Sequence, residues 1–250
     1  GTSLTNTLLG GSGEDQINGG DATSGFSVWP FSWPGDVTND MDGGGGDDEL
    51  NGGTASGLFS TTTNNMDGGD GDDTLNGGGL NLAAIWEDLV AKNFNVTDVD
   101  ILESLPLGTT TNTMDGGAGD DTLIGGSGPN LNITEIAELF GIDLSGLGLG
   151  DDISVGVTNN MTGGEGDDLL LGGSLGAENN MFGDGGNDWL VGGSVGADNE
   201  MSGGDGDDKL IGGSLLGTTN DMSGDAGEDI LLGGIAANEM HGGADDDIII

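Results

Sequence analysis

Single apolar residues recur along the chain at two fixed places in a repeated pattern. Every Met closes an Asn-x-Met triplet, and one residue later a second pattern begins, Gly-Gly-x-Gly-x-Asp-x-Leu-x. This second pattern, unit A, occurs nine times and is always nine residues long. Unit B ends in Asn-x-Met-x, varies in length and alternates with unit A until all 250 residues are used. A period kept over the whole chain indicates a repeat protein.

The apolar positions of the two units predict two facing rows of short strands. A residue between two outward-facing neighbours, as in x-Leu-x or x-Met-x, suits a strand that buries its central side chain. The Gly-rich first six residues of unit A suit a tight turn. One unit B and one unit A then form a coil, and stacked coils share one narrow core. We expect that core to contain Leu8, Ile17, Met41, Leu50, Met66, Leu75, Met114, Leu123, Met161, Leu170, Met181, Leu190, Met201, Leu210, Met222, Leu231, Met240 and Ile249.

The pattern therefore predicts an all-β fold, a parallel β-roll or β-solenoid of about nine coils that forms a single domain over residues 1–250. All extra residues fall in unit B, before its Asn, so the insertions lie on one edge of the roll. They occupy residues of about 21–38, 54–63, 79–111 and 127–158.

Two insertions have the sequence pattern of short helices. Asn81 can cap an apolar stripe that ends at Val90, and Asn132 with Glu135 resembles a capping box before Phe140. Two readings of the insertions remain open: they fold onto the roll as local covers, or they bind a ligand or a neighbouring molecule.

Composition alone would predict disorder, since the chain has 33% hydrophobic residues and a net charge of −43. Only Lys92 and Lys209 oppose that charge. A polyanion repels phosphate, which excludes nucleic acid and an electrostatic grip on anionic membrane. No apolar run approaches the ~20 residues that span a bilayer, so we expect no direct membrane insertion. The absence of Cys excludes disulfides.

The sixth position of unit A is Asp in all nine copies. Stacked coils would bring these carboxylates to about 5 Å from one another, where like charges repel by roughly 1 kcal/mol per pair even in water. A hard cation with oxygen ligands, such as Ca²⁺, relieves that repulsion. The candidate metal ligands are Asp15, Asp48, Asp73, Asp121, Asp168, Asp188, Asp208, Asp229 and Asp247.

Unit A resembles the RTX, or haemolysin-type, calcium-binding nonapeptide repeat. Clean copies are GGDGDDTLN at 68–76, GGAGDDTLI at 116–124 and GGDGDDKLI at 203–211. The resemblance implies a right-handed parallel β-roll in which backbone carbonyls and the sixth-position Asp of adjacent turns share each Ca²⁺. Nine turns leave eight gaps, so it implies about eight Ca²⁺ ions along one edge. The likeness is greatest to repeat-only subunits of surface layers or filaments.

Unit B departs from the family pattern because its corresponding residue is Asn in all nine copies, for example Asn6 and Asn159. An amide both donates and accepts hydrogen bonds, so an Asn column can bond along the stack without metal. We therefore expect one calcium edge and one metal-free edge. The often acidic fifth position of unit A, as in Asp72 and Asp120, is interpreted as mostly solvated.

The outward positions of the unit A strands change from polar to apolar along the chain. An apolar patch confined to one face usually marks a contact surface, and either the insertions or another subunit could cover it. The residues expected to make lateral contacts are Leu169, Leu171, Trp189, Val191, Ile211, Ile230 and Leu232.

Catalysis is not expected. The one His, His241, lies at an outward position, and the H-E-x-x-H and G-x-S-x-G motifs are absent. Joined tail to head, Ile250 and Gly1 would continue the repeat without a missing residue. Two explanations remain: a fragment trimmed at repeat boundaries, or a subunit that stacks head to tail with copies of itself into an open fibre.

The leading functional hypothesis is an extracellular, cell-surface structural protein that calcium stabilises and that assembles into a filament, sheath or surface layer. The alternative is the calcium-binding repeat region of a larger secreted adhesin or hydrolase. Ice binding is disfavoured because the Thr clusters 61–63 and 109–111 are expected in loops rather than in ordered outward rows.

Overall fold

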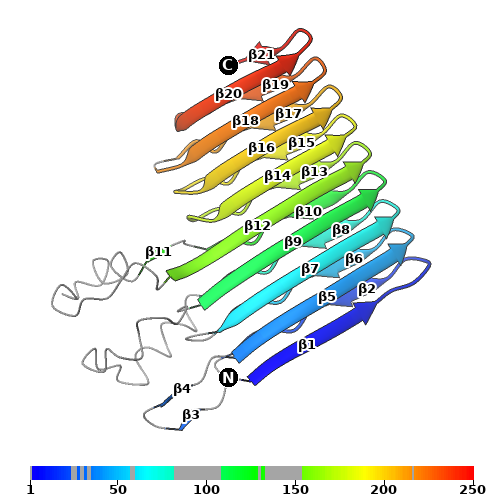
Figure 1. Cartoon of the computed structure of the whole chain (residues 1–250), viewed down its shortest axis with the longest axis vertical. Helices are drawn as coiled ribbons and strands as arrows, with labels where there is room; N and C mark the ends of the chain where they lie inside the picture. Colours follow the sequence, from blue (N-terminus) through cyan, green and yellow to red (C-terminus); the bar gives the residue numbers. More distant parts are fainter. Residues whose placement is uncertain are drawn as a thin grey trace, which may run out of the picture.

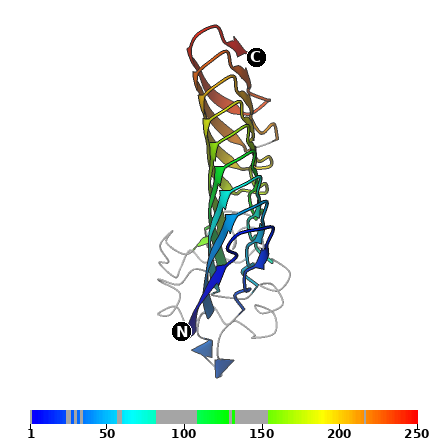
Figure 2. The same ribbon diagram turned by 90° about the vertical axis from the view of Figure 1, so that its right-hand side faces the viewer.

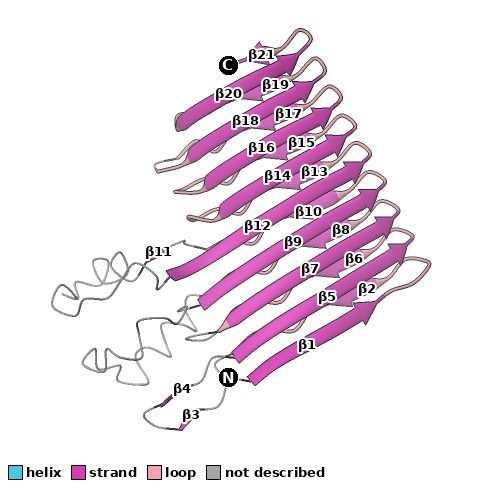
Figure 3. Cartoon of the chain, in the orientation of Figure 1, coloured by secondary structure: helices cyan, strands magenta, loops and turns pink. Residues whose placement is uncertain are grey.

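The structure is a computed structural model. It describes residues 2–23, 27–28, 31–32, 35–56, 60–81, 108–128, 131–132, 154–215 and 217–250. Every regular element in these ranges is a β-strand (Figure 3). Among the same residues there is no helix long and apolar enough to cross a membrane. The strands form two stacked parallel sheets with the N- and C-termini at opposite ends of the stack (Figure 1).

The first sheet contains the long strands contributed mainly by unit B. In spatial order its main path is β1 (Thr2–Leu9), β5 (Gly35–Gly45), β7 (Thr61–Asp70), β9 (Gly108–Ala118), β12 (Ser154–Glu165), β14 (Glu178–Gly185), β16 (Asp198–Asp205), β18 (Thr219–Ala226) and β20 (Ala237–Ala244). Spatial order equals chain order, so each coil lies on the one before it.

The second sheet contains the short strands of unit A and runs in the same order. Its strands are β2 (Gln16–Asn18), β6 (Glu49–Asn51), β8 (Thr74–Asn76), β10 (Thr122–Ile124), β13 (Leu169–Leu171), β15 (Trp189–Val191), β17 (Lys209–Ile211), β19 (Ile230–Leu232) and β21 (Ile248–Ile249). Seen edge-on in Figure 2, the stack is thin. The predicted parallel β-roll is confirmed.

The register keeps each core residue on its equivalent in the next coil. Met41 pairs with Met66 in the first sheet, and Leu50 pairs with Leu75 in the second. The Met and Leu columns form one buried cluster, with Leu8 and Met240 partly buried against it. Ile249 is the exception to the predicted core: it is 48% exposed because β21 is the edge strand of its sheet.

The long strands extend further than the predicted x-Met-x triplets. They continue into the first residues of unit A, and at the other end they take in residues 35–38, 61–63, 108–111 and 154–158, which the sequence assigns to insertions. The alternation of inward and outward side chains continues there, since Val37, Thr62, Thr110 and Val157 are buried in matching register. The long strands of the first sheet are therefore extended by residues that also place small side chains in the interior.

The prediction that the Thr clusters lie in loops is wrong. Residues 61–63 and 109–111 lie in β7 and β9. Two of their outward members, Thr63 and Thr111, belong to a row in which neighbours pair directly: Thr5, Thr38, Thr63, Thr111 and Thr158. The row stops at Glu178 in the next coil, and outward carboxylates such as Asp40 flank it, so it is not a continuous uncharged surface.

The described parts of the insertions are small. A two-stranded hairpin joins β3 (Ser27–Val28) to β4 (Phe31–Ser32), and β11 (Leu131–Asn132) pairs antiparallel with β12. The two predicted helical segments lie outside the described residues, apart from their capping residues Asn81 and Asn132. They comprise residues 82–90 and 133–140.

The predicted Asn ladder is confirmed. At Asn64, Oδ1 accepts bonds from the Asn39 amide and from the Gly53 N–H. Its Nδ2 donates to the Gly53 carbonyl and to Oδ1 of Asn112. Asn112, Asn159 and Asn179 repeat this pattern with their own glycines and neighbours. Each amide is therefore saturated although it is buried.

Replacing one rung of this ladder should be costly. In Asn64→Ala, the Gly53 amide and carbonyl and the side chains of Asn39 and Asn112 all lose a buried partner. We expect the free energy of unfolding to fall by about 3 kcal/mol, the range for buried groups left unpaired. The measurement is urea unfolding in saturating calcium.

Asn65→Ala is the matched control, because Asn65 is the next residue on the same strand but is exposed and makes one exposed hydrogen bond, to Asp40. It should cost less than about 1 kcal/mol. Equal losses in the two variants would contradict a structural role for the ladder.

Candidate calcium-binding edge

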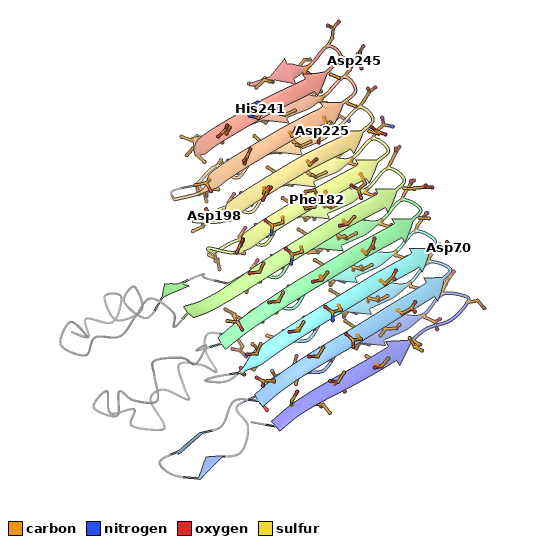
Figure 4. The ribbon with its side chains drawn as sticks, in the orientation of Figure 1. Asp70, Phe182, Asp198, Asp225, His241 and Asp245 are labelled. Atoms are coloured by element: carbon orange, nitrogen blue, oxygen red, sulfur yellow. The ribbon has the colours of Figure 1, made fainter. Side chains whose placement is uncertain are left out.

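The nine unit A turns lie on the edge opposite the Asn ladder, where each long strand passes into the next short strand. Figure 4 places Asp70 and Asp245 on this edge. The second and fourth residues of the turn need positive φ, as at Gly69 (φ 104°) and Gly71 (φ 134°). Three turns use Asp at one of these positions, and Asp184, Asp225 and Asp245 also have positive φ. The turn geometry is therefore retained where the Gly pattern is broken.

The sixth-position Asp residues line this edge, one per coil. The seven interior carboxylates, from Asp48 to Asp229, are at most 3% exposed. Asp15 and Asp247, in the first and last coils, are half-buried. The structure thus brings together all nine sequence-predicted residues in one row of stacked turns.

The two oxygens of each interior carboxylate have different surroundings. Oδ1 accepts the backbone N–H of the equivalent Asp in the preceding coil: the Asp73 amide donates to Asp121 at 2.7 Å, and the Asp121 amide donates to Asp168 at 2.7 Å. Oδ2 is buried and has no hydrogen-bond partner among the described residues. This holds for Asp48, Asp73, Asp121, Asp168, Asp188, Asp208 and Asp229.

The first Gly of each turn keeps the space beside Oδ2 open. A Cβ placed on Gly116 would collide with Oδ2 of Asp121 and with the carbonyl oxygen of Gly163 in the next coil. Gly68 and Gly183 meet the equivalent carboxylate and carbonyl in the same way. A carboxylate oxygen of one coil and a backbone carbonyl of the next therefore lie next to one another at each turn.

Without a counter-ion, the carboxylates resist ionisation. Burial raises the pKa of Asp121 to about 7; the hydrogen bond from the Asp73 amide lowers it, and the charges of Asp168 and Asp73 add to the rise. Burial likewise raises the pKa of Asp208 to about 7 and that of Asp73, Asp168 and Asp188 to about 6. The edge is thus a row of acids that need positive charge at neutral pH.

The fifth-position residues have a role that the sequence interpretation missed. They are exposed, as expected, but Oδ1 of Asp72 accepts the backbone N–H of Asp120, and Oδ1 of Asp120 accepts that of Asp167. Asn187 takes the same place between Asp167 and Asp207. One feature of the sequence could have indicated this role: the fifth position of unit A always has a side chain with an oxygen atom, even at Asn187, where that side chain is uncharged.

The sequence pattern of a known family, described as the RTX calcium-binding nonapeptide repeat (4 copies), matches more than half of the chain. The matched residues are 1–23, 61–81, 108–131, 158–174, 176–194, 195–214 and 217–250. The chain belongs to the RTX calcium-binding repeat family. No curated protein and no solved structure shows significant similarity to it. The matched RTX pattern describes calcium binding and no catalytic activity.

The residues of this RTX edge fit calcium. No three Asp, Glu, His or Cys side chains group around one point in the described part of the chain, so backbone carbonyls must provide most of the ligands. Oδ2 of the sixth-position Asp is the charged oxygen available as a metal ligand. The neighbouring carbonyls are hard oxygen ligands of the kind that Ca²⁺ accepts. A bound Ca²⁺ would supply the positive charge that lets adjacent carboxylates remain ionised while buried. Among the described residues, the interior amides of the Asn edge leave no such oxygen unpaired, because each amide is saturated.

Removing one carboxylate should weaken calcium-dependent folding. Asp121→Asn keeps a side-chain oxygen that can accept the hydrogen bond of the Asp73 amide. It loses the negative charge and the unpaired oxygen Oδ2. We expect fewer ions bound per chain and a several-fold higher calcium midpoint for β-structure. The control, Asp120→Asn, changes its exposed neighbour and should leave both quantities within about twofold, because an exposed charge contributes little. Calorimetric titration measures the number of ions bound, and circular dichroism during a calcium titration measures the midpoint. Equal effects of the two substitutions would argue against the sixth-position row as the ligand set.

The metal-free chain should be more structured in acid than at neutral pH. The folded-state pKa values lie above the ordinary 3.8, at about 6 to 7, so the folded state binds more protons between these limits. Stability is then greatest below pH ~4 and is lost as pH rises through ~7. Circular dichroism in EDTA should show more β-structure at pH 4.5 than at pH 8. Calcium should abolish this loss at pH 8; β content that rises with pH in EDTA would contradict the argument.

Proposed function

We propose that the chain is an extracellular structural protein whose calcium-loaded rolls stack head to tail into a filament, sheath or surface layer. The observation that carries this proposal is the unbroken repeat register of the described stack, which a second copy could continue. The first coil presents the open edges of β1 and β2, and the last coil presents those of β20 and β21. If a second copy continues the register, Met240 lies on Leu8 and Ile249 on Ile17, as equivalent residues do inside the chain.

The ends also carry apolar side chains that stacking would bury. Leu4 of β1 is 56% exposed and Ile249 of β21 is 48% exposed, whereas their register partners Val37 and Leu231 are buried. Burial of apolar surface at an edge whose backbone groups are also unpaired favours addition of another strand. Because one end fits the other and not itself, the contact does not close and produces a fibre.

The outer face of the second sheet supports a lateral contact between rolls. In the last five coils this face carries Leu169, Trp189, Val191, Ile211 and Leu232, with Trp189 47% exposed and Leu232 41% exposed. Residues 169–177, 189–197, 209–218, 230–237 and 248–250 contain no Asp or Glu, in a chain with 45. Two polyanionic rolls can approach only where carboxylates are absent, so we assign this face to a neighbouring roll.

Calcium links the assembly to an extracellular location. We expect about eight ions per chain, one in each gap between unit A turns. Where calcium is scarce, the net charge of −43 opposes folding; at the ~1 mM calcium typical of extracellular sites, the carboxylate row can stay ionised and buried. We propose that the chain remains unfolded until export and then folds and assembles.

A second candidate is the repeat region of a larger secreted adhesin or hydrolase. The family match favours it, since the matched pattern describes a calcium-binding repeat alone. In that case adjoining segments of the larger protein would cover the ends of the roll, and no self-stacking would occur.

Electron microscopy of the 250-residue chain distinguishes these candidates. With 2 mM calcium, we expect filaments that disappear in EDTA, together with loss of β-structure by circular dichroism. Val191→Asp combined with Ile211→Asp places charge on the lateral face and should give thin, unbundled filaments. Monodisperse, folded particles in calcium at all protein concentrations would reject assembly and support the repeat-region candidate.

A further inference from the structure

Three coils carry the same chemically labile step at the same place. Asn is followed directly by Gly only three times in the chain, at Asn18, Asn51 and Asn76. Each of these residues ends its short strand, and the register stacks them into an outer Asn column on the second sheet. In later coils the same position is apolar, as at Ile124 and Leu171.

The Asn ladder fixes the Gly of each step. A Cβ on Gly52 would lie 2.8 Å from Nδ2 of Asn64, and a Cβ on Gly77 would lie equally close to Nδ2 of Asn112. Real side chains do not approach so closely, so Gly is required there. The residue before it is free to change, and in these three coils that residue is Asn.

An Asn–Gly step can react without an enzyme or a cofactor. The backbone nitrogen of Gly attacks Cγ of the Asn side chain to form a cyclic imide; the Cγ–Nδ2 bond breaks, and Nδ2 leaves as ammonia with the proton of the Gly nitrogen. Water then opens the imide to aspartate or to isoaspartate. Gly favours the reaction because no side chain hinders its nitrogen and its backbone is flexible.

The folded roll withholds the nitrogen that attacks. The N–H of Gly52 donates to the Asn76 carbonyl at 2.8 Å, and the N–H of Gly77 donates to the Ile124 carbonyl at 2.7 Å. Closing the imide ring needs a rotation of the chain between Asn and Gly, which the strand pairing of Asn51 with Asn76 prevents. The reaction therefore requires local or global opening of the roll.

We propose that the outer Asn column is a site of spontaneous deamidation that the folded roll protects and the calcium-free chain exposes. The inference rests on the proposed calcium-dependent folding and goes beyond it, because it gives the unfolded state a limited chemical lifetime. A chain that folds soon after it meets calcium keeps all three amides, and a chain that stays unfolded loses them.

The products do not fit the folded coil. Nδ2 of Asn51 donates to Oε1 of Glu49 at 3.0 Å and to Oδ1 of Asn18 at 3.2 Å. An aspartate in its place loses both bonds and sets its charge beside that of Glu49. Isoaspartate inserts an extra methylene into the backbone just before Gly52, which lies against the ladder residue Asn64. Deamidation of the unfolded chain should therefore hinder refolding.

Peptide mass spectrometry of the full chain after incubation at pH 8 tests the inference. The conditions are 2 mM calcium, EDTA, and EDTA with concentrated urea, which unfolds the chain whatever its response to calcium. Deamidation of Asn51 should be at least about tenfold slower in calcium than in EDTA or urea, because the folded roll rarely opens. Asn65 is the internal control: it precedes Met66 and should stay unmodified in urea over the same period.

Equal rates at Asn51 in all three conditions would reject protection by the roll. If the rate in EDTA were as slow as in calcium while the rate in urea was fast, calcium control and the proposed calcium-dependent folding would fail. Protection by the roll would then stand on its own.

A triple variant tests the consequence for folding. Asn18→Gln, Asn51→Gln and Asn76→Gln keep the amides, but Gln closes its larger ring far more slowly. Both proteins are incubated in urea with EDTA and returned to calcium, and each is compared with its own fresh sample. The unaltered chain should regain less β-structure by circular dichroism, while the variant regains it fully. Equal losses would reject the link between deamidation and refolding.

Discussion

The burial of ionised carboxylates in a row is the constraint on which this fold depends. The turns of unit A cannot stack without placing one Asp side chain of each coil next to the same side chain of its neighbours, and the interior ones are almost fully removed from water. An isolated buried charge is strongly unfavourable. The raised pKa values of Asp121 and Asp208 express this cost. The unfolded chain has no such row of carboxylates, so a cation bound along the row would favour the folded state at neutral pH.

The two edges of the roll solve one packing problem with different chemistry. Both place a short polar side chain under a Gly-rich turn, and both let it bond to the next coil. The amide of Asn64 has donors as well as acceptors, so backbone and neighbouring side chains satisfy it completely. The carboxylate of Asp73 only accepts, and one of its oxygens is left over. The leftover oxygen is available to a cation at one edge, while the other edge carries the insertions.

The sequence predicted the features that the repeat period determines. The period specifies which residues stack, and therefore the Met and Leu columns, the Asp row and the Asn ladder. Features that depend on the ends of strands could not be read from it. The inward burial of Thr62 and Thr110 is set by pairing with Val37 and Val157 rather than by their own polarity. That pairing moves the Thr clusters from predicted loops into strands.

The roll needs little apolar surface because each coil uses its neighbours as its core. A coil contributes about one Met and one Leu to a continuous column, and its polar turns are held by ladders that repeat the same bond between successive coils. An error in register would break several of these bonds at once, so a narrow core can still specify one alignment. The same economy makes the burial of each coil depend on its neighbours: Ile249 and Asp15, in the outermost coils of the described stack, are more exposed than their equivalents in interior coils.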